Sequence, residues 1–389
     1  MTQTNEADLA AQRAAKNMNF LANSYAAKKK MNAQNGNTFA AGSQLSFTAP
    51  ILPGWARKMR IFYDLNVALT SAGGAGTATL NAGAPYNILS NVAVDFSGQN
   101  HRNHSGYLLK LLQQTYRGLL DLDASKAYAN AIISSSLPVA AGAAGVEVDN
   151  KWKGYMDVPL QIEANDVGGL VPIGESATPL TLRLTCAPQF AGTDPLSNCI
   201  SLVGDTVAVV TGTITAVVDY RYGQSVHSPA IRPETPYIGT FAKIIDQVTA
   251  INNTSDYTTT ELRQPYPHLK VMQLVVVPSL GSQFCDPAEI GGTRFDLDPS
   301  TVMLDYSPAG AGYNGLLVDQ RELYHGDLDP GVIVYDFIAG SMPEVPNGMN
   351  TPNIGNYNAA QTEVLYSGAL AGVNDRLITA SMFLEPLPY

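Results

Sequence analysis

Residues 57–70, RKMRIFYDLNVALT, alternate apolar and polar side chains with a period of two. One face of this stretch is apolar and comprises Met59, Ile61, Tyr63, Leu65, Val67 and Leu69. The opposite face carries Arg60, Asp64 and Asn66. Successive side chains of a β-strand point to opposite sides of the sheet, so this period predicts a long strand with one buried face.

Strand-like segments recur along most of the chain. The first half contains YMDVPLQIEA, PLTLRLTCAP and DTVAVVTGTITAVVDYRY, and the second half contains LKVMQLVVVP, GVIVYDFI and RLITASMFLEPL. Turn-rich loops separate them, and the regular strand–helix alternation of a doubly wound sheet is absent. We therefore predict a mainly β protein with two jelly-roll β-sandwiches side by side, an N-terminal helix and a few short helices.

Two stretches favour helices within this β pattern. Residues 6–30 contain neither proline nor glycine and are rich in alanine, which predicts one N-terminal helix with a thin apolar stripe. Residues 105–117 predict a second helix, with Ser105 placed to cap it and Gly118 to end it. A further helix is expected to start near Asp123.

The chain loses its periodicity near residues 223–235, where prolines accumulate, and we place a linker there. The expected organisation is a basic helical arm over residues 1–36, a first jelly roll over 37–228 and a second over 229–389.

Charge is scarce and unevenly distributed. Charged residues make up 14% of the 389 residues, against about 25% in typical soluble proteins, and the net charge is -10. The first 36 residues nevertheless carry a net charge of +3. Their basic residues are Arg13, Lys16, Lys28, Lys29 and Lys30. An acidic body does not favour specific nucleic-acid binding, but a basic arm suits an anionic surface such as a lipid membrane. The alternative is that these terminal charges are simply solvated.

No targeting or disulfide pattern stands out. The three cysteines, Cys186, Cys199 and Cys285, lack a C-x-x-C pair, and free thiols are expected. The N-terminus lacks the apolar run of a signal peptide, and no stretch approaches the roughly 20 apolar residues of a membrane span. Synthesis and folding in the host cytoplasm are expected.

The sequence contains no recognisable catalytic, metal or cofactor motif. His101 and His104 form H-x-x-H in a predicted polar turn, without the further ligands that zinc needs. The glycine-rich stretch PAGAGYNG is not predicted to run from a strand into a helix as a phosphate-binding loop must, and it favours a flexible loop. Asp327 and Asp329 lack the rest of a calcium loop and favour a turn. We therefore predict no catalytic residue, no metal ligand and no cofactor.

A family resemblance rests on the order of these segments in residues 8–225. The basic N-terminal segment is followed by GAPYNILSNVAVDFSGQNHRNHSGYLLKLL, the strand YMDVPLQI, the connection EANDVGGLVPIGESATP and the strand LTLRLTCAP. This order resembles the major capsid proteins of tectivirus-like phages, in the double jelly-roll lineage that includes adenovirus hexon. Beyond residue 225 the resemblance is limited to size and strand alternation.

The resemblance implies a non-enzymatic structural protein of the virion. It implies pseudo-hexagonal homotrimers that tile an icosahedral shell around an internal membrane, together with neighbouring trimers, penton proteins and minor capsid proteins. The arm would face that membrane or a neighbour through Arg13, Lys16, Lys28, Lys29 and Lys30.

Two other classes stay open at this point. A tandem β-sandwich could be a lectin or a virion vertex or spike protein that binds carbohydrate or a receptor, although the chain has only two tryptophans for such loops. A glycoside hydrolase would need two facing carboxylates about 5 to 9.5 Å apart, which the sequence cannot place.

Overall fold

The structure is a computed structural model of the whole chain. The residues it describes are 6–71, 77–115, 134–135, 147–162, 167–174, 179–203, 205–222, 236, 240–264, 266, 268–277, 284–298, 301–308, 312–324, 327–337, 360–370 and 375–386. Strands dominate within these ranges. The helices there are α1 (Glu6–Asn23), α2 (Gly106–Gln114), α4 (Gly312–Tyr324) and the short 3₁₀ turns η1 (Tyr86–Ile88) and η3 (Pro287–Glu289).

The first half of the chain forms a β-sandwich. One layer contains β1 (Tyr25–Lys30), β13 (Asp205–Tyr222), β4 (Gly54–Ser71), β9 (Glu147–Pro159) and β8 (Ser134–Ser135) in that order, with β10 (Val171–Pro172) paired to β4. The facing layer contains β7 (Gln99–His104), β6 (Leu89–Phe96), β11 (Thr181–Cys186), β3 (Gln44–Thr48) and β2 (Asn32–Ala33). A separate pair consists of β5 (Thr77–Leu80) and β12 (Ile200–Val203).

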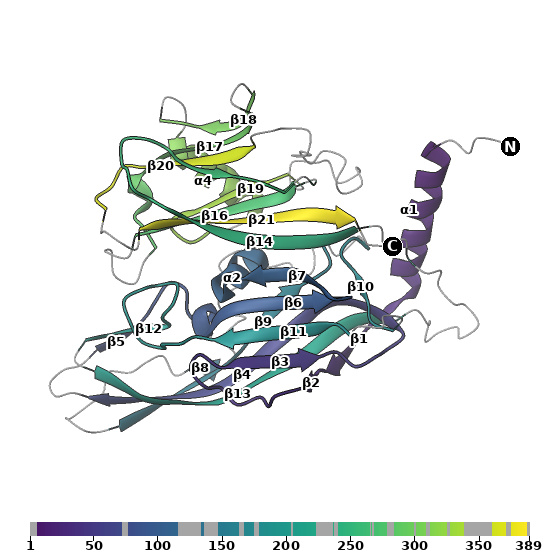
Figure 1. The fold of residues 1–389 in the computed structure, drawn as a ribbon, viewed down its shortest axis with the longest axis horizontal. Helices are drawn as coiled ribbons and strands as arrows, with labels where there is room; N and C mark the ends of the chain where they lie inside the picture. Colours follow the sequence, from purple (N-terminus) through teal and green to yellow (C-terminus); the bar gives the residue numbers. More distant parts are fainter. Residues whose placement is uncertain are drawn as a thin grey trace.

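The second half repeats this two-layer arrangement. Its first layer contains β14 (Thr240–Ala250), β21 (Arg376–Pro386), β16 (His268–Val276) and β19 (Val332–Asp336). The opposite layer contains β15 (Thr258–Glu261), β20 (Gln361–Tyr366), β17 (Ile290–Asp298) and β18 (Thr301–Tyr306), and α4 packs on its last two strands. The predicted pair of β-sandwiches side by side is confirmed (Figure 1).

One sheet runs through both sandwiches. Strand β14 of the second half pairs in parallel with β7 of the first, where Ile244 lies opposite Arg102 and Ile245 opposite Asn103. This junction joins the two inner layers into a single nine-stranded sheet. The larger hydrophobic core is shared as well, since Leu65 of the first half and Met272 of the second belong to the same cluster.

Strand β4 confirms the strongest sequence prediction. Its apolar positions from Met59 to Leu69 are buried at every second residue, whereas Asp64 is exposed. The eighteen-residue strand β4 pairs with β13 along nearly its whole length and with β9 over Lys58–Thr70, so the buried face lies at the centre of the first sandwich.

The predicted helix over residues 6–30 is wrong in its last third. Helix α1 ends at Asn23, and residues 25–30 form β1, which pairs antiparallel with Val217–Tyr222 of β13. Pairing with a preformed strand overrides the local helix preference of alanine and lysine. The arm is therefore part helix and part sheet, and the boundaries predicted at residues 36 and 228 stay predictions.

The helix predicted at residues 105–117 is confirmed as α2, with its apolar side buried. Ser105 occupies the cap position, but its side chain makes no capping hydrogen bond.

The stretch PAGAGYNG connects β18 to α4, so the expectation that it would not lead from a strand into a helix was wrong. Gly118, the helix expected near Asp123 and the linker at 223–235 lie outside the described residues.

Candidate functional site

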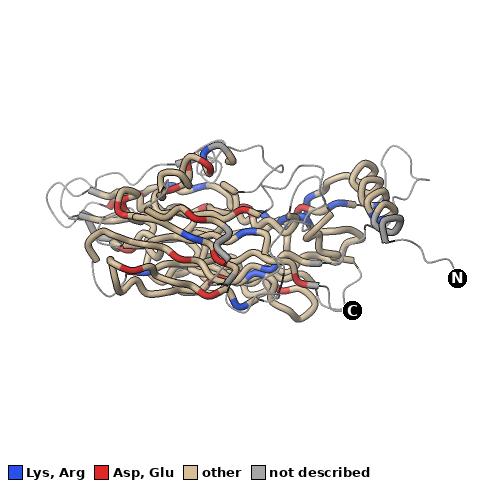
Figure 2. The backbone as a smooth tube through the Cα atoms, turned by 90° about the horizontal axis from the view of Figure 1, so that it is seen from above, with Lys and Arg blue, Asp and Glu red and all other residues tan. Residues whose placement is uncertain are grey.

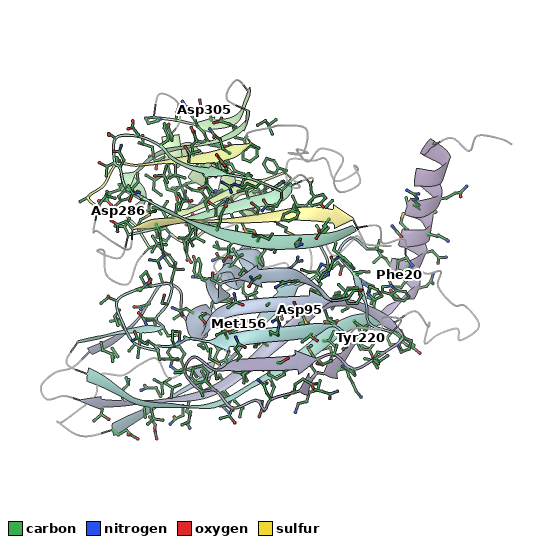
Figure 3. The ribbon with its side chains drawn as sticks, viewed as in Figure 1. Phe20, Asp95, Met156, Tyr220, Asp286 and Asp305 are labelled. Atoms are coloured by element: carbon green, nitrogen blue, oxygen red, sulfur yellow. The ribbon has the colours of Figure 1, made fainter. Side chains whose placement is uncertain are left out.

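Helix α1 contacts the body through its C-terminal end. Phe20 is fully buried, and its ring meets Trp55 edge-on with the centroids 5.0 Å apart. Val167 and Leu170 complete this small apolar cluster. Residues 11–16 are all exposed, and the helix projects from the body (Figures 1 and 3). Phe20 therefore anchors an arm whose residues 11–16 are exposed to solvent.

Arg221 of β13 closes the end of the same helix. Its guanidinium donates hydrogen bonds to the carbonyl oxygen of Leu21 at 3.4 Å and to the Ser24 hydroxyl at 3.2 Å. A cation is favourable there because the C-terminal end of a helix carries partial negative charge. Burial lowers the pKa of Arg221, and the nearby charge of Arg57 lowers it further. The arm thus leaves the body in a direction set by Phe20 and Arg221.

The structure divides the five basic residues predicted for the arm between two elements. Arg13 and Lys16 lie on the exposed part of α1. Lys28, Lys29 and Lys30 lie on β1, the edge strand of the first sandwich, and all three are exposed. Lysines on an edge strand discourage non-specific pairing with other strands, which gives the run a structural role as well.

A buried charge cluster lies beside β1, and sequence reasoning missed it. Asp157 of β9 accepts hydrogen bonds from Lys58 at 2.7 Å and from Arg60 at 2.6 and 2.8 Å. Asp219 of β13 binds Arg57 through two hydrogen bonds of 2.7 and 2.9 Å. Both carboxylates are almost fully buried. The signal available in the sequence was the repeated basic residues on the polar face of residues 57–60.

Protonation in this cluster follows from its contacts. Burial alone would raise the pKa of Asp157, but hydrogen bonds from Arg60 and the charge of Lys58 outweigh it, so the pKa lies below its usual range. Burial lowers the pKa of Lys58, and Asp157 offsets part of that effect. The stacked Tyr155 ring lies 4.0 Å from the Arg60 guanidinium carbon. The cluster holds charges rather than a reactive acid or base.

A second set of polar contacts joins the two halves around α2. The backbone N–H of Ser105 donates to Asp246 of β14 at 3.1 Å. At the other side of the helix, Asp329 accepts hydrogen bonds from Lys110 at 2.5 Å and from Tyr107 at 2.8 Å. Asp329 therefore helps to join the two halves, which its predicted place in a turn did not include. Asp327 forms an ion pair with Arg321 nearby.

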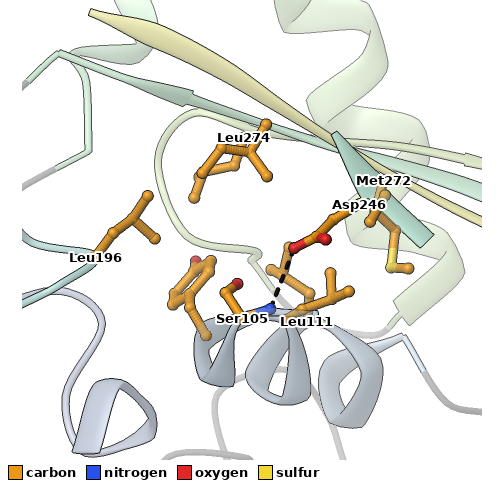
Figure 4. A pocket seen from close by; sticks show the side chains of 10 residues that line it. Ser105, Leu111, Leu196, Asp246, Met272 and Leu274 are labelled. Carbon is orange, nitrogen blue, oxygen red and sulfur yellow. Dashed lines mark hydrogen bonds between the residues drawn. The ribbon is translucent and has the colours of Figure 1, made fainter. Parts of the chain in front are cut away.

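The space between α2 and the second half contains a small pocket (Figure 4). Apart from Ser105, Tyr107 and Asp246 its lining is apolar, and it includes Leu108, Leu111, Leu196, Met272, Leu274, Ile378 and Ala380. Burial raises the pKa of Asp246, and the Ser105 N–H partly counteracts this. A single carboxylate among aliphatic side chains lacks the second group that acid–base catalysis requires.

His101 and His104 lie on strand β7 and not in the polar turn that the sequence predicted. The turn itself contains fewer residues than predicted. Ser97 and Gly98, both with positive φ, make the turn, and β7 carries His101 and His104 into the interior. Burial lowers the pKa of His104 to about 4, only partly offset by its contact with the Ser105 carbonyl, so it is neutral near pH 7. Both residues are structural.

Other reactive side chains are also buried. Cys186, Cys199 and Cys285 are free thiols inside the protein, and burial raises the pKa of each. The described residues contain no group of three or more histidine, cysteine or acidic side chains arranged to hold a metal ion. In the same part of the chain, none of the helices has the length and hydropathy needed to cross a membrane.

Two jelly-roll sandwiches that share an inner sheet define the double jelly-roll architecture, and comparisons of whole folds agree. No family model matches the chain, and no curated protein matches its sequence. The fold is similar to the major capsid protein of Sulfolobus turreted icosahedral virus. The two share 13% identity and a TM-score of 0.59 over 94% of this chain and 98% of that one.

Two further solved structures support the same fold. VP54 of PBCV-1 is 12% identical, with a TM-score of 0.59 over 93% of this chain and 94% of the other. The major capsid protein P2 of bacteriophage PM2 is 9% identical, with a TM-score of 0.51 over 94% and 98%. At these identities the similarity establishes the double jelly-roll fold, as the sequence predicted.

Proposed function

We propose that this protein is the major capsid protein of an icosahedral virus and acts as a structural, non-enzymatic component of the virion shell. The observation that carries this proposal is the match of both sandwiches, over more than nine-tenths of each chain, to the capsid proteins of two such viruses. The low content of charged residues supports it, because large permanent interfaces are depleted in charge.

The proposed assembly unit is a homotrimer with a pseudo-hexagonal outline. Two similar sandwiches per chain give six similar units in three copies, which suits a shell of hexagonally packed neighbours. Its partners would be other trimers, penton proteins and minor capsid proteins, in a bacteriophage of tectivirus-like architecture.

The trimer can be tested by the solution mass of the purified protein. We expect a stable species near three times 41.4 kDa that persists on dilution, because obligate interfaces couple folding to association. Analytical ultracentrifugation or light scattering measures this mass. A well-folded monomer at micromolar concentration would contradict the proposal.

We propose that the exposed part of α1 faces the internal membrane of the virion. Arg13 and Lys16 are exposed on an arm that projects from the body. A basic residue near an anionic bilayer contributes about 1 kcal/mol, and many copies on one vesicle act together. The strand lysines Lys28–Lys30 form a separate group on β1, on the body rather than on the projecting helix.

Replacing Arg13 and Lys16 with glutamine should weaken binding of the assembled protein to anionic vesicles. The expected loss is about 2 kcal/mol per subunit, or roughly 30-fold per subunit, at low salt. Vesicle co-sedimentation measures it. The matched control replaces the exposed Lys151 and Lys153 of β9, and equal binding by both variants would reject the membrane-facing role.

A further inference from the structure

The charge of this chain differs strongly between its two halves. Residues 229–389 contain 18 acidic and 7 basic residues, a net charge of -11, whereas residues 37–228 contain 13 acidic and 11 basic, a net charge of -2. Adding the basic arm makes the first half slightly positive. A contact of the first half with the second half of another copy therefore avoids placing two acidic halves against each other.

The accessible positive charge of the first half is concentrated on β1. Lys28 lies directly across from Asp219, but that carboxylate already accepts two hydrogen bonds from Arg57. The next carboxylate along this face, Asp157, is occupied by Lys58 and Arg60. Both nearby carboxylates therefore already have basic partners, and Lys28, Lys29 and Lys30 remain as exposed positive charge. We call these three residues the basic edge. In Figure 2, basic and acidic segments are interspersed along the body, and some basic segments lie near α1.

The outer face of the four-stranded sheet carries an excess of acid. Asp305, Arg294 and Glu363 lie side by side on β18, β17 and β20, and Asp296 and Glu261 follow on the same face. Arg294 is bonded to Asp305, and Arg263 to Glu261. We call Glu261, Asp305 and Glu363 the acidic face, and the buried Asp296 lies beneath it.

Asp296 and Glu363 show that negative charge at the acidic face is only partly compensated, although Gln361 and Arg294 both act on Asp296. Asp296 is 94% buried, and its Oδ1 atom has no hydrogen-bond partner in the structure. Burial raises the pKa of Asp296, and burial together with the charge of Asp296 raises the pKa of Glu363. A carboxylate group crowded by others is stabilised by an added cation from outside.

The two surfaces cannot meet within one copy. Asp305 of the acidic face lies at the top of the second sandwich in Figure 3, and Tyr220, which pairs with Ala27 of β1, lies on the first sandwich near the base of α1. A contact that joins different surfaces of identical chains is heterologous, and such contacts form a ring when the rotation between copies closes. This is the geometry that a cyclic trimer requires.

We propose that the basic edge of one copy contacts the acidic face of the next copy and so determines the direction of the ring. The proposal rests on the trimer proposed above and specifies which surfaces form it. Complementary charges at the rim of an interface mainly accelerate correct encounter and exclude wrong orientations. Trimer formation should therefore slow about tenfold or more between low salt and about 1 M salt, where the screening length falls to about 3 Å.

A charge-swap experiment tests this contact. One variant carries Lys28→Glu and Lys30→Glu, a second carries Glu261→Lys and Glu363→Lys, and a third combines all four changes. Lys151→Glu with Lys153→Glu, on the far part of β9, is the control with the same change in charge. The fraction of trimer and its rate of formation are measured by ultracentrifugation and light scattering at low and high salt.

We expect each two-site variant to reduce the trimer fraction at least tenfold at low salt, and the four-site variant to restore it. Restoration excludes misfolding as the cause. The proposal would be overturned if both two-site variants formed trimers with the same salt response as the unmodified protein. It would also be overturned if these variants lost binding to anionic vesicles while their trimers stayed unchanged. A monomeric unmodified protein would instead reject the proposed trimer itself.

Discussion

Replacing Asp157 with alanine is expected to lower the free energy of unfolding by about 3 to 5 kcal/mol. The change removes the shared acceptor of Lys58 and Arg60, whose side chains are 6% and 18% exposed. Two cations would then lie in a largely buried place without their direct ion-pair partner, and the loss of one partner of a buried ion pair costs far more than the pair contributes. Urea unfolding followed by circular dichroism measures the difference.

Asp64→Ala is the matched control for this substitution. Asp64 lies on the same sheet and pairs with Lys153 at 2.8 Å, but both side chains are about half exposed. Exposed pairs contribute at most about 1 kcal/mol, so this variant should remain close to the unmodified protein. Both must be compared at one protein concentration, because association would stabilise the folded state. Similar losses in the two variants would show that the charge cluster is not a special stabilising feature.

Local patterns were sufficient to predict the elements whose side chains face a core. The alternation around Met59 and Leu65 reflects burial on one side of β4, which any sandwich of this kind would impose. The apolar stripe of α2 was equally readable, since Leu108 and Leu111 pack between the halves. The double jelly-roll expectation added connectivity that periodicity alone does not contain.

Features that depend on distant segments could not be predicted from local sequence. Lys28 and its neighbours have no strong strand preference, and β1 forms because β13, nearly two hundred residues later, offers an open edge. The same reason applies to His104, which looks polar in sequence but follows β7 into the interior. Likewise, the pairing of Asp157 with Lys58 joins residues that are 99 positions apart.

The two halves should not fold separately, although each is a recognisable sandwich. Parallel pairing of β7 with β14 provides backbone hydrogen bonds across the junction, and Lys110 binds Asp329 beside it. The larger core also includes side chains of both halves, so separation would expose Leu111 and Met272 to water. Each half would lose both apolar burial and partners for buried polar groups, and the roughly 5 to 15 kcal/mol of stability typical of a domain leaves little margin for such losses.

Residues 1–228 and 229–389 expressed alone are therefore expected to be unfolded or aggregated, whereas the full chain should unfold in a single cooperative transition. Calorimetry and the dispersion of amide proton signals measure these outcomes. Co-expression of the two fragments is the control, because reassembly of the nine-stranded sheet should recover soluble protein with the properties of the full chain. A well-dispersed spectrum from either fragment would show that its sandwich has a sufficient core of its own. In that case the shared sheet would be a contact between two domains that fold independently, and the β7–β14 pairing together with the polar contacts of Asp246 and Asp329 would hold them in a fixed orientation.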